Sequence, residues 1–131
     1  MNGLLTVALG GAIGASARYL LGGVSLRVMG AGFPWGTFVA NVLGGLLMGL
    51  LVGWLAHKGS QLEGGAQNLR LFLGVGVLGG FTTFSAFSLD TMLMIEKKAY
   101  GLAAGYISAS VVLSILALFL GLVIARKVFV L

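Results

Sequence analysis

The sequence predicts an all-α integral membrane protein with four transmembrane helices per subunit, and three observations support this prediction. Hydrophobic residues make up 59% of the 131 residues, charged residues make up only 8%, and the mean hydropathy is +1.10. A helix that spans the bilayer needs about 20 mostly apolar residues, and four segments of the chain are long enough. The 23 glycines suit membrane helices, where small residues let two backbones approach closely. A single transmembrane domain over residues 1–131 is therefore expected.

The four spans are expected at residues 4–28, 34–56, 69–95 and 101–125. The first span lacks the cationic start of a signal peptide and is expected to be retained. A short connection at 29–33 makes the first two helices antiparallel neighbours, and Pro34 suits a helix start because its missing N–H costs little there. The polar stretch 57–68 is expected to be the longest loop, and residues 96–98 mark the third turn.

In the first span, Arg18 continues the four-residue series of Gly10 and Gly14. Its guanidinium keeps its proton, so it must find a partner or reach water. Asp90, toward the end of the third span, is the only carboxylate inside a span and therefore the natural ion-pair candidate. The pattern favours a structural pair over a second interpretation, in which Arg18 lies beside a water-filled vestibule and concentrates anions there.

The second span carries a stripe of residues at four-residue steps, namely Thr37, Asn41, Gly45, Gly49 and Gly53. The glycines predict a close-packing surface. Asn41 brings an amide with two donor hydrogens and one acceptor oxygen to membrane depth. Such an amide can line an ion pathway or simply bond a neighbouring helix, and both interpretations stay open.

The most unusual segment of the sequence lies in the third span, at residues 79–88, GGFTTFSAFS. Two adjacent glycines followed by two threonines are poor helix formers, so we expect the helix to break near its centre. Broken backbone at membrane depth must be buried in protein or line a cavity. The freed carbonyls of Gly79 and Thr82 can then face a cation, and hard oxygen ligands suit sodium. A kink that threonine hydroxyls satisfy is the simpler alternative.

Aromatic and hydroxyl side chains follow the expected break. Phe84 and Phe87 share a helix face, and their electropositive ring edges beside Asn41 can receive a small dehydrated anion. Ordinary packing is the default for such a pair. In the fourth span, Tyr106, Ser110 and Ser114 recur every four residues and can form a track of hydrogen-bond donors or a packed interface of small side chains.

The distribution of Lys and Arg leaves the orientation in the membrane almost undecided. An even number of spans places both termini on one side, where four such residues lie: Lys58, Arg70, Arg126 and Lys127. The other side carries three: Arg27, Lys97 and Lys98. So small a bias permits insertion both ways and hence an antiparallel, dual-topology homodimer, with a single topology as the alternative. Four helices enclose little besides their own side chains, so a pore needs the second copy.

Several classes of function are disfavoured by composition. The chain has no cysteine and a single histidine, His57, so thiolate and histidine metal clusters are excluded. The basic residues are scattered at helix ends, which argues against nucleic-acid binding. No nucleophile has a base in an expected position, so an enzyme is not expected.

Three motifs together closely resemble the Fluc (CrcB-type) fluoride channels: GGAIGASARY at 10–19, PWGTFVAN at 34–41 and GGFTTFSAFS at 79–88. The resemblance covers essentially the whole chain. It implies a dual-topology homodimer in the bacterial plasma (inner) membrane that passively exports fluoride and so lowers its toxicity. It also implies a structural sodium ion at the dimer centre, bound by the carbonyls of Gly79 and Thr82. The residues that it implies for the fluoride pathway are Asn41, Thr83, Phe84, Phe87, Tyr106, Ser110 and Ser114.

Two rival functions are weighed against this expectation. A proton-coupled small multidrug exporter also has four helices and can adopt dual topology. It requires a membrane-embedded carboxylate, typically in the first helix, where this chain has Arg18 instead. A non-transporting helper subunit of a larger complex is the second rival.

Overall fold

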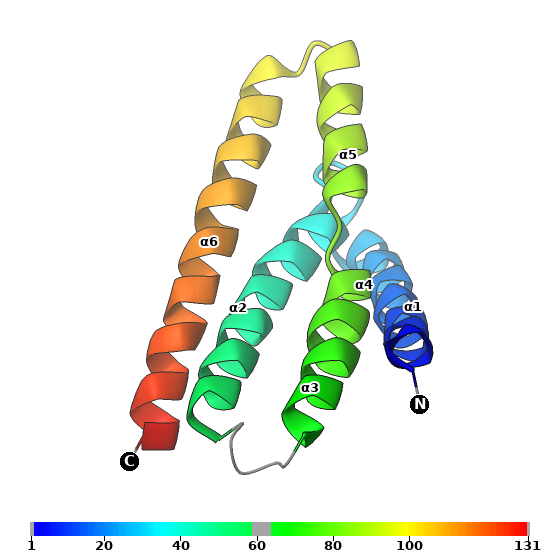
Figure 1. The fold of residues 1–131 in the computed structure, drawn as a ribbon. Coiled ribbons are helices and arrows are strands. Elements are labelled where there is room, and N and C mark those ends of the chain that lie inside the picture. The colour runs from blue at the N-terminus through cyan, green and yellow to red at the C-terminus, as the bar shows by residue number, and fades with distance from the viewer. Residues whose placement is uncertain (1, 59–63, 131) are drawn as a thin grey trace.

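The computed structural model describes residues 2–58 and 64–130, and within them four spans are long and apolar enough to cross a membrane. Three are single helices, α1 (Gly3–Met29), α2 (Trp35–Lys58) and α6 (Tyr100–Val130). The remaining span consists of consecutive segments: α3 (Gly65–Leu69), the π-helical η2 (Arg70–Leu78), α4 (Gly79–Phe81) and α5 (Phe84–Glu96). Figure 1 shows the interruption between α4 and α5, and α5 converging with α6 on the turn that joins them. The predicted all-helical, four-span architecture is confirmed.

Helix α1 packs closely on the third span through glycines. Asn2 starts the helix, because its Oδ1 accepts a hydrogen bond from the Leu5 N–H at 3.0 Å. A Cβ atom at Gly10 would lie 2.9 Å from the Gly76 Cα, and one at Gly14 would overlap the Val77 carbonyl oxygen. The two backbones are therefore in direct contact, and only glycine fits at these positions of α1.

The glycine stripe of α2 packs against α6. A Cβ atom at Gly45 would lie 2.7 Å from the Ser114 carbonyl oxygen, and one at Gly49 would overlap the Leu118 carbonyl oxygen. From the opposite side, a Cβ atom at Gly121 would overlap the Leu46 carbonyl oxygen. The predicted close-packing surface is confirmed, and it holds α6 along α2.

The expected break in the third span is present, and within the segment 79–88 it falls on the two threonines. Thr82 (φ −83°, ψ 158°) and Thr83 (φ −155°, ψ 125°) are extended, whereas Gly79 and Gly80 remain helical. Gly80 is held against α1, because a Cβ atom there would lie 2.7 Å from the Gly11 carbonyl oxygen. Thr83 suits the break because its Oγ1 accepts the Ala86 N–H at 3.1 Å and so caps α5.

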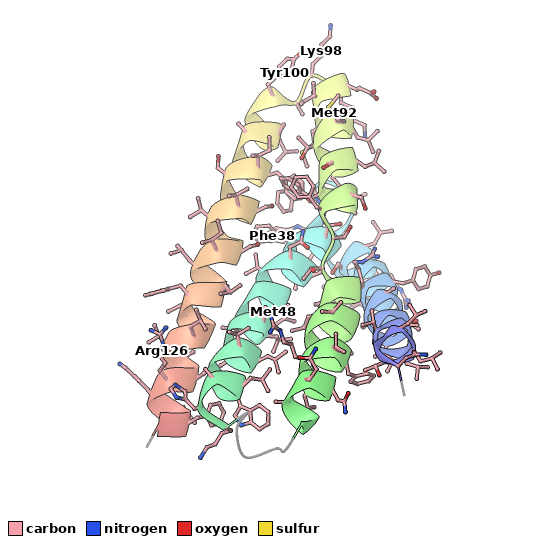
Figure 2. All side chains as sticks on the ribbon, in the orientation of Figure 1. Phe38, Met48, Met92, Lys98, Tyr100 and Arg126 are labelled. Atoms are coloured by element: carbon pink, nitrogen blue, oxygen red, sulfur yellow. The ribbon has the colours of Figure 1, made fainter. Side chains whose placement is uncertain are left out.

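The expected polar loop at 57–68 is too long. Helix α2 continues through Lys58 and α3 begins at Gly65, so both ends of that stretch are helical; residues 59–63 lie outside the described part of the chain. Helix α6 likewise runs past the expected end at residue 125. Hydropathy marks where the bilayer ends, whereas long basic side chains let a helix continue into the interface. Lys98 and Tyr100 lie at one end of the molecule and Arg126 near the other (Figure 2).

Candidate functional site

A groove of about 360 Å³ lies where the break, α2, α5 and α6 meet. The residues lining it are Asn41, Thr82, Thr83, Phe84, Phe87, Ser110, Val111, Ser114 and Ile115. The groove thus brings together every residue implied for the fluoride pathway except Tyr106. Val111 and Ile115 were not predicted; each follows a groove serine directly, so the four-residue spacing of the serines was the available signal.

Asn41 binds the backbone of the break with both ends of its amide. Its Oδ1 accepts the Thr83 N–H at 2.8 Å, and its Nδ2 donates to the Thr83 carbonyl oxygen at 3.0 Å. These bonds replace the helical bonds that the extended backbone at Thr83 cannot make. Because the amide group has two hydrogens and one bonds Thr83, the second N–H of this groove-lining side chain remains available. Asn41 therefore bonds a neighbouring span, as one of the two interpretations expected, and it also lines the groove.

The two phenylalanines of α5 contact each other with centroids 5.5 Å apart, at an interplanar angle of 44°. They differ in burial: Phe87 is 8% exposed, whereas Phe84 is 77% exposed. Phe87 also packs on Tyr106, with centroids 5.1 Å apart. One ring is thus fixed in the wall of the groove, and the other projects from this copy of the chain.

Two hydroxyl groups in the groove wall are buried without a hydrogen-bond partner. Within the described residues, no protein group bonds the Oγ atoms of Ser110 or Ser114. Buried polar atoms nearly always have partners, so an unpaired pair lining one groove points to a bound ligand or water. A hydroxyl donates one hydrogen bond, which suits an anion.

Tyr106 lies apart from the groove, behind Phe87. Its side chain is fully buried, and its hydroxyl donates to Oδ2 of Asp90 at 3.2 Å. Phe33 covers its other side, with centroids 5.3 Å apart at a nearly perpendicular 89°. The sequence identified Tyr106 and Asp90 separately as unusual polar residues in apolar spans, but gave no signal that they bond each other.

The expected Arg18–Asp90 ion pair is wrong for the part of the chain that the structure describes. The Nε–H of Arg18 donates to the Gly80 carbonyl oxygen at 3.3 Å, and Asp90 bonds Tyr106. Because Arg18 continues the face of α1 that packs on the third span, its side chain reaches the break. Arg18 therefore satisfies a carbonyl that the interrupted helix has freed.

Replacing Arg18 with methionine is expected to destabilise the protein by about 1–3 kcal/mol, because the Gly80 carbonyl would lose its donor in an apolar environment. The measurement is the free energy of unfolding in detergent. Arg18→Lys, which keeps a donor, is the matched control and should lie closer to the wild type. Equal stabilities for the methionine and lysine variants would contradict this role.

The break also leaves the two carbonyls that the sequence singled out. Among residues 2–58 and 64–130, the Gly79 and Thr82 carbonyl oxygens accept no hydrogen bond, because Thr83 and Ala86 direct their N–H groups to side chains instead. Free carbonyls at membrane depth are costly unless something binds them. Their oxygens fit a hard cation such as sodium. Within the same residues, no group of three or more His, Cys, Asp or Glu side chains offers another metal site.

Together, the four spans, the interrupted helix and the polar groove define a multi-pass membrane protein built around an opening at membrane depth. A family model described as "CrcB-like protein, Camphor Resistance (CrcB)" matches residues 5–122, and the chain belongs to this family. The resemblance of the three sequence motifs is thereby confirmed.

Named relatives match almost the whole chain. A protein of Caulobacter vibrioides (strain NA1000 / CB15N) named fluoride-specific ion channel FluC is 61% identical over 129 residues, 98% of this chain and 99% of that protein. Proteins of the same name from Caulobacter sp. (strain K31) and Hyphomonas neptunium are 60% and 54% identical, each over 98% of this chain and 98% and 99% of their own lengths. These names are those of ion channels, which confirms that the chain is not an enzyme.

Proposed function

We propose that the chain is one subunit of a fluoride-selective channel that passively exports fluoride across the bacterial inner membrane and so lowers its toxicity. The observation that carries this proposal is the groove, where Ser110 and Ser114 present buried hydroxyls without partners beside Asn41. The names of the relatives support fluoride as the ion.

The chemistry of the groove suits a small anion that must leave its water. Hydroxyl hydrogens, one amide N–H and the positive edges of aromatic rings replace the hydration shell. None of the groove residues carries a full positive charge, so the ion is bound without being trapped. Conduction requires binding that is favourable and still reversible.

The conducting unit is proposed to be an antiparallel homodimer. The groove is open on one side, and α5 leaves Phe84, Leu89 and Met92 at least half exposed. A second copy would cover these apolar side chains and supply the missing wall. The nearly balanced Lys and Arg counts of the two ends permit its inverted insertion.

Sodium is proposed to lie where the two breaks meet. Gly79 and Thr82 would contribute two carbonyl oxygens from each copy, and Gly79 is exposed in a single copy. When bound, the ion supplies positive charge that compensates carbonyl dipoles otherwise left unpaired. Arg18 bonds the neighbouring Gly80 carbonyl, so that oxygen is not counted among the proposed ligands.

The proton-coupled exporter is not favoured. Its carboxylate would have to be Asp90, which lies on the third span and already bonds Tyr106. The first span contains no carboxylate, and its charged residues are Arg18 and Arg27.

Replacing Ser110 with alanine tests the function of the groove. Fluoride efflux from proteoliposomes should fall by roughly tenfold, because a hydrogen bond to a charged group is worth about 1.5–3 kcal/mol. The free energy of unfolding should be unchanged or higher, because the hydroxyl has no protein partner. Ser108→Ala changes an exposed serine of the same helix and should leave efflux intact. Undiminished efflux from Ser110→Ala would remove this hydroxyl from the pathway.

A further inference from the structure

We propose that Asn41 couples the cation site at the break to the anion groove, so that binding of either ion strengthens binding of the other. The inference rests on the proposed fluoride and sodium sites and adds a connection between them. It arises from two hydrogen bonds and the planarity of one peptide.

The first link is the peptide between Thr82 and Thr83. The Thr82 carbonyl and the Thr83 N–H belong to the same planar group, and none of the described peptides is cis. In a trans peptide the C=O and the N–H point in opposite directions. Since the N–H points at Asn41 Oδ1, 2.8 Å away, the Thr82 carbonyl must point away from Asn41. Asn41 thereby orients the Thr82 carbonyl, one of the proposed sodium ligands.

The second link is the Asn41 amide itself. Its oxygen is engaged by the Thr83 N–H, and one amide hydrogen bonds the Thr83 carbonyl at 3.0 Å. The remaining amide hydrogen lies on a side chain that lines the groove. The Thr82–Thr83 peptide and the Asn41 side-chain amide therefore connect the Thr82 carbonyl oxygen to the second Asn41 N–H through one direct hydrogen bond.

Polarisation along this connection has a definite sign. A cation at the Thr82 oxygen withdraws electron density from the peptide, so the Thr83 N–H becomes a stronger donor. Its stronger bond to Oδ1 polarises the Asn41 amide in the same sense, and the groove-facing N–H becomes a stronger donor to an anion. Hydrogen bonds in series strengthen one another in this way where the local dielectric constant is low.

Coupling between two binding sites is reciprocal. If sodium increases the affinity for fluoride by some factor, fluoride must increase the affinity for sodium by the same factor. We expect a factor of at least about five, at the low end of measured couplings. Stabilisation of the dimer by the cation would also give reciprocal coupling, so variants of Asn41 are needed to test the route through its amide.

The coupling is measured on the full chain in lipid nanodiscs. Sodium is titrated against N-methylglucamine in the presence of fluoride or of chloride, and fluoride is titrated with and without sodium; binding is followed by thermal unfolding and calorimetry. In the wild type, sodium should increase the affinity for fluoride by the same factor by which fluoride increases the affinity for sodium. Ser114→Ala should weaken fluoride binding and keep the coupling factor. Asn41→Leu, which lacks both the amide oxygen and the amide N–H groups, should reduce the coupling factor to about one.

A second measurement needs no variant. The chain has three asparagines, Asn2, Asn41 and Asn68, so selective ¹⁵N labelling gives a side-chain NH₂ signal for Asn41 and two internal references. Adding sodium without fluoride should move the Asn41 amide protons downfield and leave those of Asn2 and Asn68 in place.

The outcomes separate this inference from the proposed function. The coupling would be overturned if wild-type protein bound both ions and neither changed the affinity for the other, or if the Asn41 NH₂ signal did not shift on adding sodium. Either result would leave the proposed channel function intact. Wild-type protein that binds no sodium or no fluoride would overturn the corresponding part of the proposed function, and the coupling with it.

Discussion

Fluoride efflux from proteoliposomes should fall by at least about a hundredfold when Asn41 is replaced by aspartate. The carboxylate can still accept the Thr83 N–H, but it cannot donate to the Thr83 carbonyl or to an anion in the groove. It also places a negative charge beside the path, and two like charges about 4 Å apart repel by about 4 kcal/mol at an effective dielectric constant near 20. The fluoride electrode gives the efflux rate directly.

The matched control is Asn68→Asp, the same chemical change at an exposed position of α3. Its efflux should equal that of the wild type. The Asn41→Asp protein must also be shown to be folded by its elution as a single species. A folded Asn41→Asp variant that conducts fluoride at the wild-type rate would place the pathway elsewhere.

Gly14→Ala is expected to destabilise the protein by about 2 kcal/mol. The new methyl group would overlap the Val77 carbonyl oxygen and lie 2.8 Å from the Phe81 backbone nitrogen. Both contacts are backbone atoms, so the third span itself would have to move; overpacking of this kind costs about 1–3 kcal/mol. Unfolding in a detergent titration measures the change.

Gly11→Ala is the control on the same helix, because a Cβ atom there meets no atom within 4 Å. Alanine is the better helix former by about 1 kcal/mol, so this variant should be as stable as the wild type or more stable. If both variants lost the same stability, the close approach of α1 to the third span would not be the cause.

Much of the fold could be predicted because membrane burial leaves a strong signal in sequence. Apolar length defined the four spans, and the four-residue glycine steps of α2 identified the surface that packs on α6. Six groove residues stood out because polar and paired aromatic side chains are unusual at that depth. The break was expected from helix propensity, which locates weak segments well.

The details that could not be predicted depend on contacts between spans. Propensity marked both the glycines at 79–80 and the threonines at 82–83 as weak and could not say which would break; Gly80 packs on α1 and stays helical, whereas Thr82 and Thr83 are extended. Charge complementarity suggested that Arg18 pairs with Asp90, whereas the carbonyl freed at Gly80 lies within reach of Arg18. Which partner a polar group chooses is decided by three-dimensional proximity, and no one-dimensional pattern records it.

The most direct test of the whole account is anion efflux from liposomes containing the wild-type protein, with potassium, valinomycin and no proton gradient. Fluoride should leave rapidly when valinomycin is added, and chloride loaded at the same concentration should stay inside. Chloride efflux at a comparable rate, or fluoride efflux only under an imposed proton gradient, would contradict a passive and selective fluoride pathway through this groove.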